Sequence, residues 1–203
     1  MVNFAFVAPL LAVASAATVY TFDPTTAGGV SGFISVAHSA QGATIQADLD
    51  VSRAKWDELT KVDGNCTGPI STFKWHIHTL WTNKAASGFL GDCGLVPAGN
   101  HYDPDFACGP NSEHVKEDKC KPITPSYKCT PETYASKPAS CERGDLSGKV
   151  GAFNAVNGKI QATFTDPYYP AAAEETPQWN LMLHAVCGAN TPRFICATGR
   201  TAC

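Results

Sequence analysis

Hydrophobic and polar residues alternate most clearly over residues 72–78. In this stretch the apolar residues alternate with polar ones: Phe73, Trp75 and Ile77 are apolar, and Lys74, His76 and His78 are polar. A period of two is typical of a β-strand with one face in a core. Both histidines therefore leave this strand on its outer face. Same-face side chains on a strand lie about 7 Å apart, close enough for two imidazoles to bind one metal ion.

Seven further segments show strand patterns, bounded by turn residues. They span residues 18–22, 30–35, 43–51, 148–153, 159–164, 178–185 and 193–197. Residues 38–42 read as a hairpin turn, with His38 a surface residue in it, and residues 53–59 have room for one helical turn. Eight strands with almost no helix predict an all-β fold, an antiparallel sandwich or barrel.

Between Trp81 and Leu146 the periodicity disappears, and Gly, Pro, Asn, Asp and five cysteines take over. The segment is predicted to be a long, cysteine-rich loop insertion. Loops of this length inside a compact domain are usually functional.

The chain has 203 residues, 44% of them hydrophobic, which is enough for one core of ordinary size. Its formal net charge is −3, and it has no run of Lys or Arg. This composition indicates no nucleic acid and no anionic membrane as a partner.

The first residues resemble a secretory signal peptide. The apolar run from Phe4 to Val13 is followed by small residues up to Ala17, although the usual basic start is missing. We therefore expect a signal peptide over residues 1–17 and one secreted, extracellular domain over residues 18–203, with association with the cell wall as one location open to it. The apolar run is too short to span a membrane, and the polar C-terminus argues against a lipid anchor.

Nine cysteines after such a signal indicate an oxidising compartment and several disulfides, with one thiol left over. None of them forms a Cys-x-x-Cys pair, which argues against a zinc ribbon or a thioredoxin-type site. Asn65-Cys66-Thr67 is an N-glycosylation sequon, so Asn65 is a candidate glycosylation site.

Histidines occur in three places that call for one explanation. His76 and His78 share a strand, His101 lies in the long loop, and His184 leaves the strand 178–185 on the face opposite Trp179, Leu181 and Leu183. Four neutral imidazoles form a nitrogen-rich site suited to copper or zinc, and in particular to tetragonal copper(II).

This arrangement resembles the copper/zinc superoxide dismutases, over about residues 18–197. In that family a His-x-His strand, a Gly-x-His loop and a Val-His strand bind copper on the outside of a Greek-key barrel. The resemblance implies an eight-stranded Greek-key fold, with one copper per chain held by His76, His78, His101 and His184. Glycines at residues 30–33 and 144–148 also resemble family positions.

Arg193-Phe-Ile-Cys196 resembles the family's Arg-x-x-Cys motif. The resemblance implies a disulfide between Cys196 and a loop cysteine, for which Cys93 is the natural partner. It also implies that Arg193 lies beside the open copper position, where a fixed cation attracts and orients superoxide.

Two departures resemble the copper-only, extracellular branch found in fungi and related microbes. Glu142 stands where a zinc-ligand histidine is expected, although Asp145 is kept, and only eight residues separate His184 from Arg193. In that branch a glutamate replaces part of the zinc's role by hydrogen-bonding the bridging histidine. Glu142 would thus orient His101. The shortened and inserted loops argue for a monomer.

Some alternatives stay open. His114 is the one residue that favours a zinc site, since with His101, Asp145 and Glu142 it would offer altered ligands. The loop cysteines are expected to form two local disulfides, among Cys108, Cys120, Cys129 and Cys141. Cys66, Cys187 and Cys203 then remain, one of them unpaired.

The reaction implied is dismutation of superoxide to dioxygen and hydrogen peroxide by a copper ion that alternates between two oxidation states. His101 would exchange the metal for a proton, positioned by Glu142, so the catalytic residues expected are Arg193, Glu142 and His101. One alternative is a secreted protein that binds or buffers copper without turnover, for which Arg193 would be unnecessary. Another is a structural cysteine-rich module. Hydrolase motifs such as Gly-x-Ser-x-Gly and His-Glu-x-x-His are absent.

Overall fold

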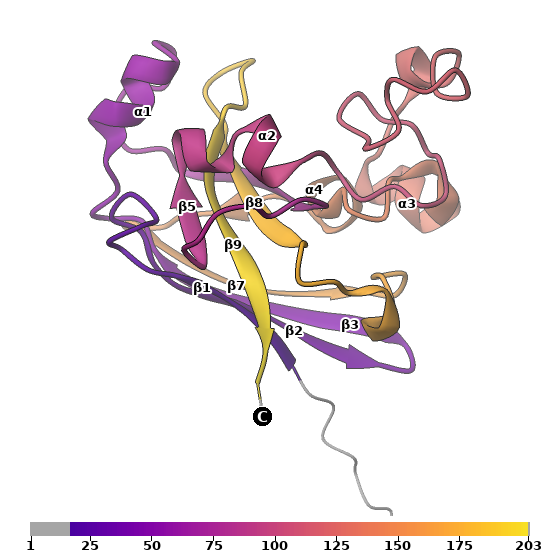
Figure 1. Ribbon diagram of the computed structural model, residues 1–203, viewed down its shortest axis with the longest axis horizontal. Helices are drawn as coiled ribbons and strands as arrows, with labels where there is room; N and C mark the ends of the chain where they lie inside the picture. The colour runs from indigo at the N-terminus through magenta and orange to yellow at the C-terminus, as the bar shows by residue number, and fades with distance from the viewer. Residues whose placement is uncertain (1–16, 203) are drawn as a thin grey trace, which may run out of the picture.

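The computed structural model describes residues 17–202, whose strands form a nearly closed antiparallel barrel (Figure 1). Eight strands pair in the order β6-β4-β8-β9-β1-β2-β3-β7, and a short ninth, β5, pairs with β9. The strands are β1 (Ala17–Phe22), β2 (Ser31–Ser39), β3 (Gly42–Asp50), β4 (Thr72–His78), β5 (Ser87–Phe89), β6 (Phe153–Asn154), β7 (Lys159–Asp166), β8 (Asn180–Ala185) and β9 (Arg193–Thr201). The all-β fold predicted from the sequence is confirmed. Of the predicted signal peptide only Ala17 belongs to the described residues, and Cys203 also lies outside them.

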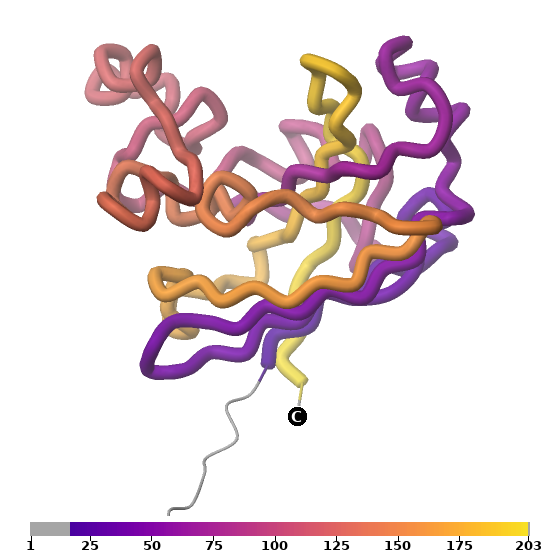
Figure 2. The backbone as a smooth tube through the Cα atoms, turned by 180° about the vertical axis from the view of Figure 1, so that it is seen from behind, coloured from indigo at the N-terminus to yellow at the C-terminus, as the bar shows by residue number. Residues whose placement is uncertain are grey.

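Half of the barrel is a four-stranded antiparallel sheet, in which the consecutive strands β1, β2 and β3 are extended by β7 through a crossover; we call this sheet, seen from behind in Figure 2, the meander. In β3, buried and exposed residues alternate along the whole strand. Its buried members Ile45 and Leu49 join the main core, and the alternate side chains face solvent. This is the usual construction of an antiparallel sheet with one wet face.

The other half, β4, β8 and β9, is covered on both faces. Phe73, Trp75 and Ile77 of β4 point into the same core as the meander, as their period predicts. The Trp75 ring stacks on Phe153 with centroids 4.3 Å apart, and its indole N–H donates to the carbonyl of Gly151. The opposite face, which holds the histidines, is buried beneath loop segments.

Helices are short and lie outside the barrel. They are α1 (Trp56–Val62), α2 (Leu95–Ala98), α3 (Pro131–Ser136), α4 (Leu146–Val150) and the 3₁₀ turns η1 (Leu90–Cys93), η2 (Thr124–Ser126), η3 (Pro138–Ser140) and η4 (Ala172–Glu174). Several of them, with β5, occupy the segment predicted as continuous loop. Their turns are too short to show a periodic pattern.

Two local predictions were wrong. Residues 148–153 were expected to form a strand, but α4 occupies the first three of them, because the Asp145 side chain accepts a hydrogen bond from the Gly148 N–H and caps a helix there. His38 was placed in a turn but lies in β2, where its Nε2 is 2.9 Å from Glu175. The hairpin turn is tighter than expected and comprises residues 40–41 only.

Four disulfides connect the described cysteines. Cys93–Cys196 and Cys66–Cys187 tie loops to the barrel, with partners more than 100 residues apart in the chain. Cys108–Cys120 and Cys129–Cys141 are local to the insertion. All eight cysteines within residues 17–202 are therefore paired.

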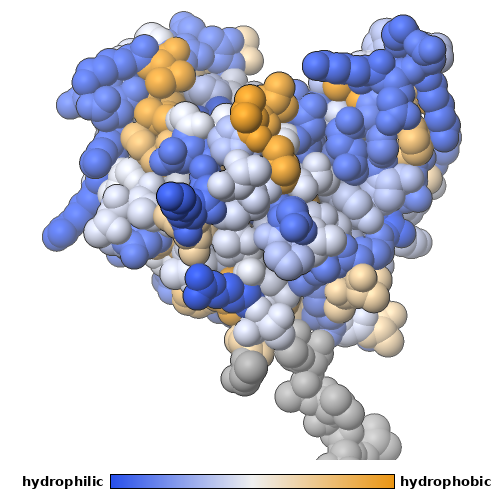
Figure 3. Space-filling model, in the orientation of Figure 1, coloured by the Kyte–Doolittle hydropathy of each residue, from blue (hydrophilic) through white to orange (hydrophobic). Residues whose placement is uncertain are grey.

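The surface in Figure 3 is largely hydrophilic, with small hydrophobic patches, one of them over α2. Leu95 and Val96 on this helix are 54% and 81% exposed. Within residues 17–202 there is no helix with the length and hydrophobicity needed to cross a membrane.

Candidate metal centre

Four histidines meet on the covered outer face of β4 and β8. His76 and His78 come from β4, His184 comes from β8, and His101 is bridged to His78 by backbone pairing. The register between β8 and β9 shifts at Leu183 and His184, so the pairing is irregular at this ligand. One ligand atom from each of the four lies within 4.8 Å of the others, and the residues are 0–7% exposed.

Each ring uses one nitrogen to bond the surrounding protein. His78 Nδ1 lies 2.9 Å from the carbonyl oxygen of Gly99, and His184 Nδ1 lies 3.0 Å from that of Thr191. A carbonyl oxygen only accepts, so both rings carry their proton on Nδ1. Nε2 is left with a free lone pair in each.

Carboxylates fix the other two rings in the same way. His101 Nδ1 is 2.5 Å from Glu142 Oε2, and His76 Nε2 is 3.4 Å from Asp145 Oδ1. His76 therefore presents Nδ1, and His101 presents Nε2. The buried side-chain atoms that lack a hydrogen-bond partner include all four of these presented nitrogens.

The site also favours the neutral form of three of its histidines, His76, His78 and His184. Burial, followed by the neighbouring His101, lowers the pKa of His76 to about 4. Burial likewise lowers the pKa of His78 and of His184 well below the ordinary value for imidazole. Four buried imidazole nitrogens that face one another without a hydrogen-bond partner are costly, and a metal ion with an affinity for imidazole would supply a common partner. The residues therefore fit the copper ion that the sequence suggests.

Glu142 is almost completely buried behind His101. Its side chain is 1% exposed, and its Oε1 has no hydrogen-bond partner. Burial raises the pKa of Glu142, while the His101 ring counteracts this. The one polar contact of the carboxylate is therefore with Nδ1 of His101, which it holds in place.

Asp145 lies behind His76 and belongs to the N-terminus of α4. Burial alone would raise its pKa, but the hydrogen bond from His76 and the nearby imidazoles lower it. Asp145 and Glu142 thus form a pair of supports, one for each of two histidines. Such carboxylate–histidine contacts fix ring orientation and ligand basicity.

Arg193 enters the site from the start of β9. Its guanidinium donates to the carbonyl oxygens of Cys93 at 3.1 Å and Gly99 at 2.7 Å. The Cys93–Cys196 disulfide holds the first of these acceptors against β9. With His76, His101 and His184, Arg193 lines a cleft of about 750 Å³ that also contacts the insertion.

His114 does not approach this centre as a ligand. Its ring stacks on Phe106 with centroids 4.1 Å apart, and its Nδ1 is 2.6 Å from Glu117. Among residues 17–202, the four histidines are the single group of His, Cys, Asp or Glu side chains arranged to hold a metal ion. The alternative zinc site through His114 therefore has no assembled ligand set here.

Sequence reasoning missed three supports of the site. Two are the backbone carbonyls of Gly99 and Thr191, which no side-chain pattern reveals. The third is Tyr127, whose hydroxyl contacts both Asp145 and Glu142. A tyrosine two residues before a cysteine of the insertion was a weak signal at best.

Comparisons with known proteins agree with this architecture. No family model matches the chain, and no curated protein sequence does. Among solved structures, a mutant of superoxide dismutase 5 from Candida albicans matches with a TM-score of 0.54 and 18% sequence identity, over 93% of this chain and 94% of that one. A Cu/Zn superoxide dismutase from Brucella abortus has 19% identity and a TM-score of 0.47, over 91% and 97%. The chain thus has the fold of the Candida enzyme.

Proposed function

We propose that this protein is a secreted, copper-dependent superoxide dismutase that works without zinc. One observation carries the proposal, namely that the four partnerless nitrogens of His76, His78, His101 and His184 converge beside the guanidinium of Arg193. The fold shared with the Candida dismutase supports it.

A bound copper ion would supply the one-electron chemistry that converts two superoxide anions and two protons into dioxygen and hydrogen peroxide. The four imidazoles would hold it, since nitrogen-rich sites suit copper. Arg193 would draw the anion into the cleft and orient it, because its planar cation is fixed by two carbonyl oxygens. His101 would hold and release a proton at Nε2, while Glu142 keeps Nδ1 in place.

Glu142 is the basis for proposing a copper-only site. In place of a second metal, its carboxylate meets the outer nitrogen of His101, and Asp145 meets that of His76. Both bonds orient copper ligands without a zinc ion. His114, the remaining zinc candidate, is engaged with Glu117 and Phe106.

The proposed extracellular location is supported by the four disulfides, which persist in oxidising compartments. Asn65 is exposed, in keeping with its proposed glycosylation. We propose a monomer, in which the insertion flanks the cleft of its own chain.

Copper binding without turnover is the second candidate function. The histidine cluster alone would serve it equally well. A buffer, however, has no use for a guanidinium fixed in the same cleft as the ligands, and Arg193 therefore favours dismutation.

The test is to load the purified secreted protein with copper and zinc together, measure both metals, and follow superoxide consumption. We expect about one copper per chain, no zinc and rapid turnover. Copper without turnover would favour the buffer, and bound zinc would contradict the copper-only site. Loss of all metal binding would leave only the fold.

A further inference from the structure

Tyr127, in the cysteine-rich insertion, lies behind the two carboxylates of the site. Its hydroxyl donates to Asp145 Oδ2 at 2.8 Å and accepts the backbone N–H of Glu142 at 3.2 Å. Burial, followed by the charges of Asp145 and Glu142, raises its pKa, so the hydroxyl keeps its proton and remains a donor. Both hydrogen-bonding capacities of this group are thus directed at the supports of the histidines.

Each support leads directly to a different imidazole. Asp145 receives Tyr127 on Oδ2 and faces His76 through Oδ1, whereas Glu142 is held by its backbone and bonds His101 through Oε2. The Tyr127 hydroxyl is therefore separated from two of the four metal-facing histidines, His76 and His101, by only one residue each. The segment that carries it lies outside the barrel.

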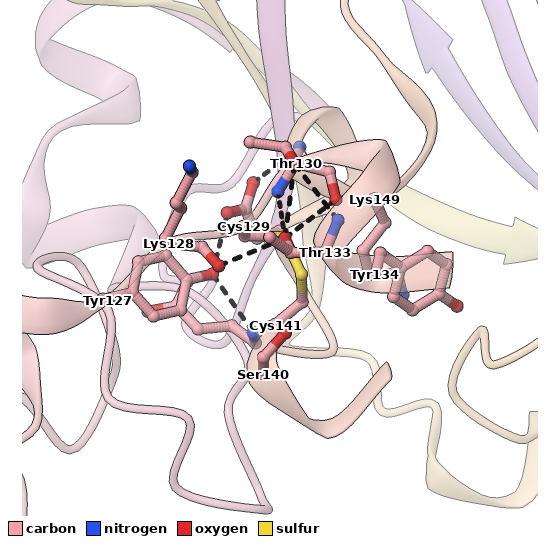
Figure 4. Close-up of a disulfide and its surroundings, with 12 residues drawn as sticks. Tyr127, Lys128, Cys129, Thr130, Thr133, Tyr134, Ser140, Cys141 and Lys149 are labelled. Carbon is pink, nitrogen blue, oxygen red and sulfur yellow. Dashed lines mark hydrogen bonds between the residues drawn. A yellow bond between two sulfur atoms is a disulfide. The ribbon is translucent and has the colours of Figure 1, made fainter. Parts of the chain in front are cut away.

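The Cys129–Cys141 disulfide fixes this geometry (Figure 4). Cys129 follows Tyr127 by two residues, and Cys141 directly precedes Glu142. The disulfide therefore connects the same two chain segments, one with Tyr127 and one with Glu142, that the hydrogen bond of the tyrosine hydroxyl connects. Thr133 Oγ1 adds a bond to the Lys128 carbonyl at 3.3 Å, which holds the same segment from the N-terminal turn of α3.

Packing around the hydroxyl leaves little freedom. A Cβ atom on Gly109 would lie 2.2 Å from Glu142 Oε1 and 3.0 Å from the Tyr127 ring, so the insertion approaches both residues as closely as a glycine allows. A Cβ atom on Gly148 would lie 2.5 Å from the Cys129 sulfur. The disulfide is thus packed against the first turn of α4, which Asp145 caps.

We propose that Tyr127 is a positioning residue, whose hydroxyl sets the orientation of Asp145 and Glu142 and thereby of His76 and His101. In this role the disulfide-closed insertion supplies, through one tyrosine, the rigidity that a second metal ion would give. The inference deepens the proposed function and rests on it for its effect on copper. Its effect on the metal-free histidines is independent of turnover.

The test is Tyr127→Phe, which keeps the ring and removes only the hydroxyl. Loss of a group that supports metal ligands typically lowers affinity by 10–100-fold. We expect the affinity for Cu(II), measured by competition with a chelator, to fall by about 10-fold, with a changed electron paramagnetic resonance spectrum. An unchanged affinity and spectrum would overturn the proposal.

Tyr134→Phe is the matched control. It removes a tyrosine–carboxylate hydrogen bond from the same insertion, but the acceptor is Asp166 of β7, which pairs with Lys149. Loss of stability is expected in both variants, while the altered copper spectrum is expected in Tyr127→Phe alone. If Tyr134→Phe changes the spectrum equally, Tyr127 has only a general structural role.

Proton magnetic resonance of the metal-free protein separates this inference from the proposed function. In the wild type we expect slowly exchanging signals from His76 Nε2–H and His101 Nδ1–H, each with a cross-peak to its carboxylate side chain, and faster exchange of both in Tyr127→Phe. If the copper-loaded wild type lacks turnover but exchange is still faster in Tyr127→Phe than in the wild type, the proposed dismutase activity is refuted and the positioning role of Tyr127 is retained. Absence of a protected Tyr127 hydroxyl proton in the wild type would refute that role without any variant.

Discussion

In β3 and β7 exposed side chains recur along each strand, whereas all six residues of β8 are buried. Both sets of strands belong to one antiparallel barrel and share one core. The difference arises outside it, since only the second half is overlaid by loops. Asn180 illustrates the overlay, because its amide donates to the carbonyl oxygens of Leu80 at 2.8 Å and Ala98 at 3.1 Å.

The overlay changes the chemistry of ordinary strand residues. A polar side chain on the meander remains in water, but His76 and His78 are buried, and one ring nitrogen of each contacts the surrounding protein. Their inner nitrogens are left facing His101 and His184. A metal-binding face therefore differs from a plain one by its cover more than by its strands.

The largest effect is expected when one of the four histidine nitrogens that face the metal site is removed. His78→Ala should lower copper affinity by more than about 100-fold, since loss of a ligand costs more than loss of a ligand's support, which is worth about 10–100-fold. Chelator competition measures this. His114→Ala is the control and should bind copper normally. Equal losses in both variants would contradict the assigned ligand set.

The meander should respond to substitution in the opposite way. Leu49→Ala removes a fully buried side chain from β3 and should lower the free energy of unfolding by about 2–5 kcal/mol, measured by urea denaturation. Copper stoichiometry should stay at the wild-type value, because the site is formed by the other half. A loss of copper in the folded variant would show that the halves are not separable.

The pH dependence of stability should expose the covered histidines. Burial lowers the pKa of His76 in the folded state to about 4, whereas the ordinary pKa of histidine, which applies to the unfolded chain, is about 6.5. Between these values the unfolded state binds more protons, so the free energy of unfolding of metal-free protein should decrease as pH falls. The slope expected is on the order of 1 kcal/mol per pH unit for each such histidine.

Copper provides the control for this experiment. A bound metal ion competes with protons for the same nitrogens, so the loaded protein should keep its stability to lower pH. Thermal denaturation of both forms between pH 4 and 7 measures the difference. A flat profile for the metal-free form would mean that the histidines are not desolvated.

A smaller effect is expected for Arg193, which lines the cleft. Arg193→Met keeps the approximate length of the side chain but removes its charge, and should slow superoxide consumption by about 10-fold at low ionic strength, with copper retained. Arg200→Met changes an exposed arginine of the same strand, β9, and should have little effect. Full activity of Arg193→Met would remove the guidance role proposed for it.

Most of the strands, and the three histidines that lie on strands, were predictable because both follow from periodicity, whereas His101 lies in the non-periodic insertion and was assigned from the family resemblance. Alternation placed Phe73, Trp75 and Ile77 in the core and the two histidines of β4 opposite. The cover was not predictable, because Gly99 and Thr191 contribute backbone carbonyls, which every residue has. The prediction of a strand at residues 148–153 was wrong because the Asp145 side chain caps α4 and stabilises a helix there. A helix of one turn is too short to show a hydrophobic periodicity in the sequence.

The most direct test of the account is the set of nitrogens bound to copper. Cu(II)-loaded protein grown with ¹⁵N-histidine should show hyperfine coupling to four imidazole nitrogens in electron paramagnetic resonance, and its crystal structure should show Nδ1 of His76 with Nε2 of His78, His101 and His184. A copper ion bound elsewhere, or bound through oxygen ligands with any of these four nitrogens free, would contradict the account.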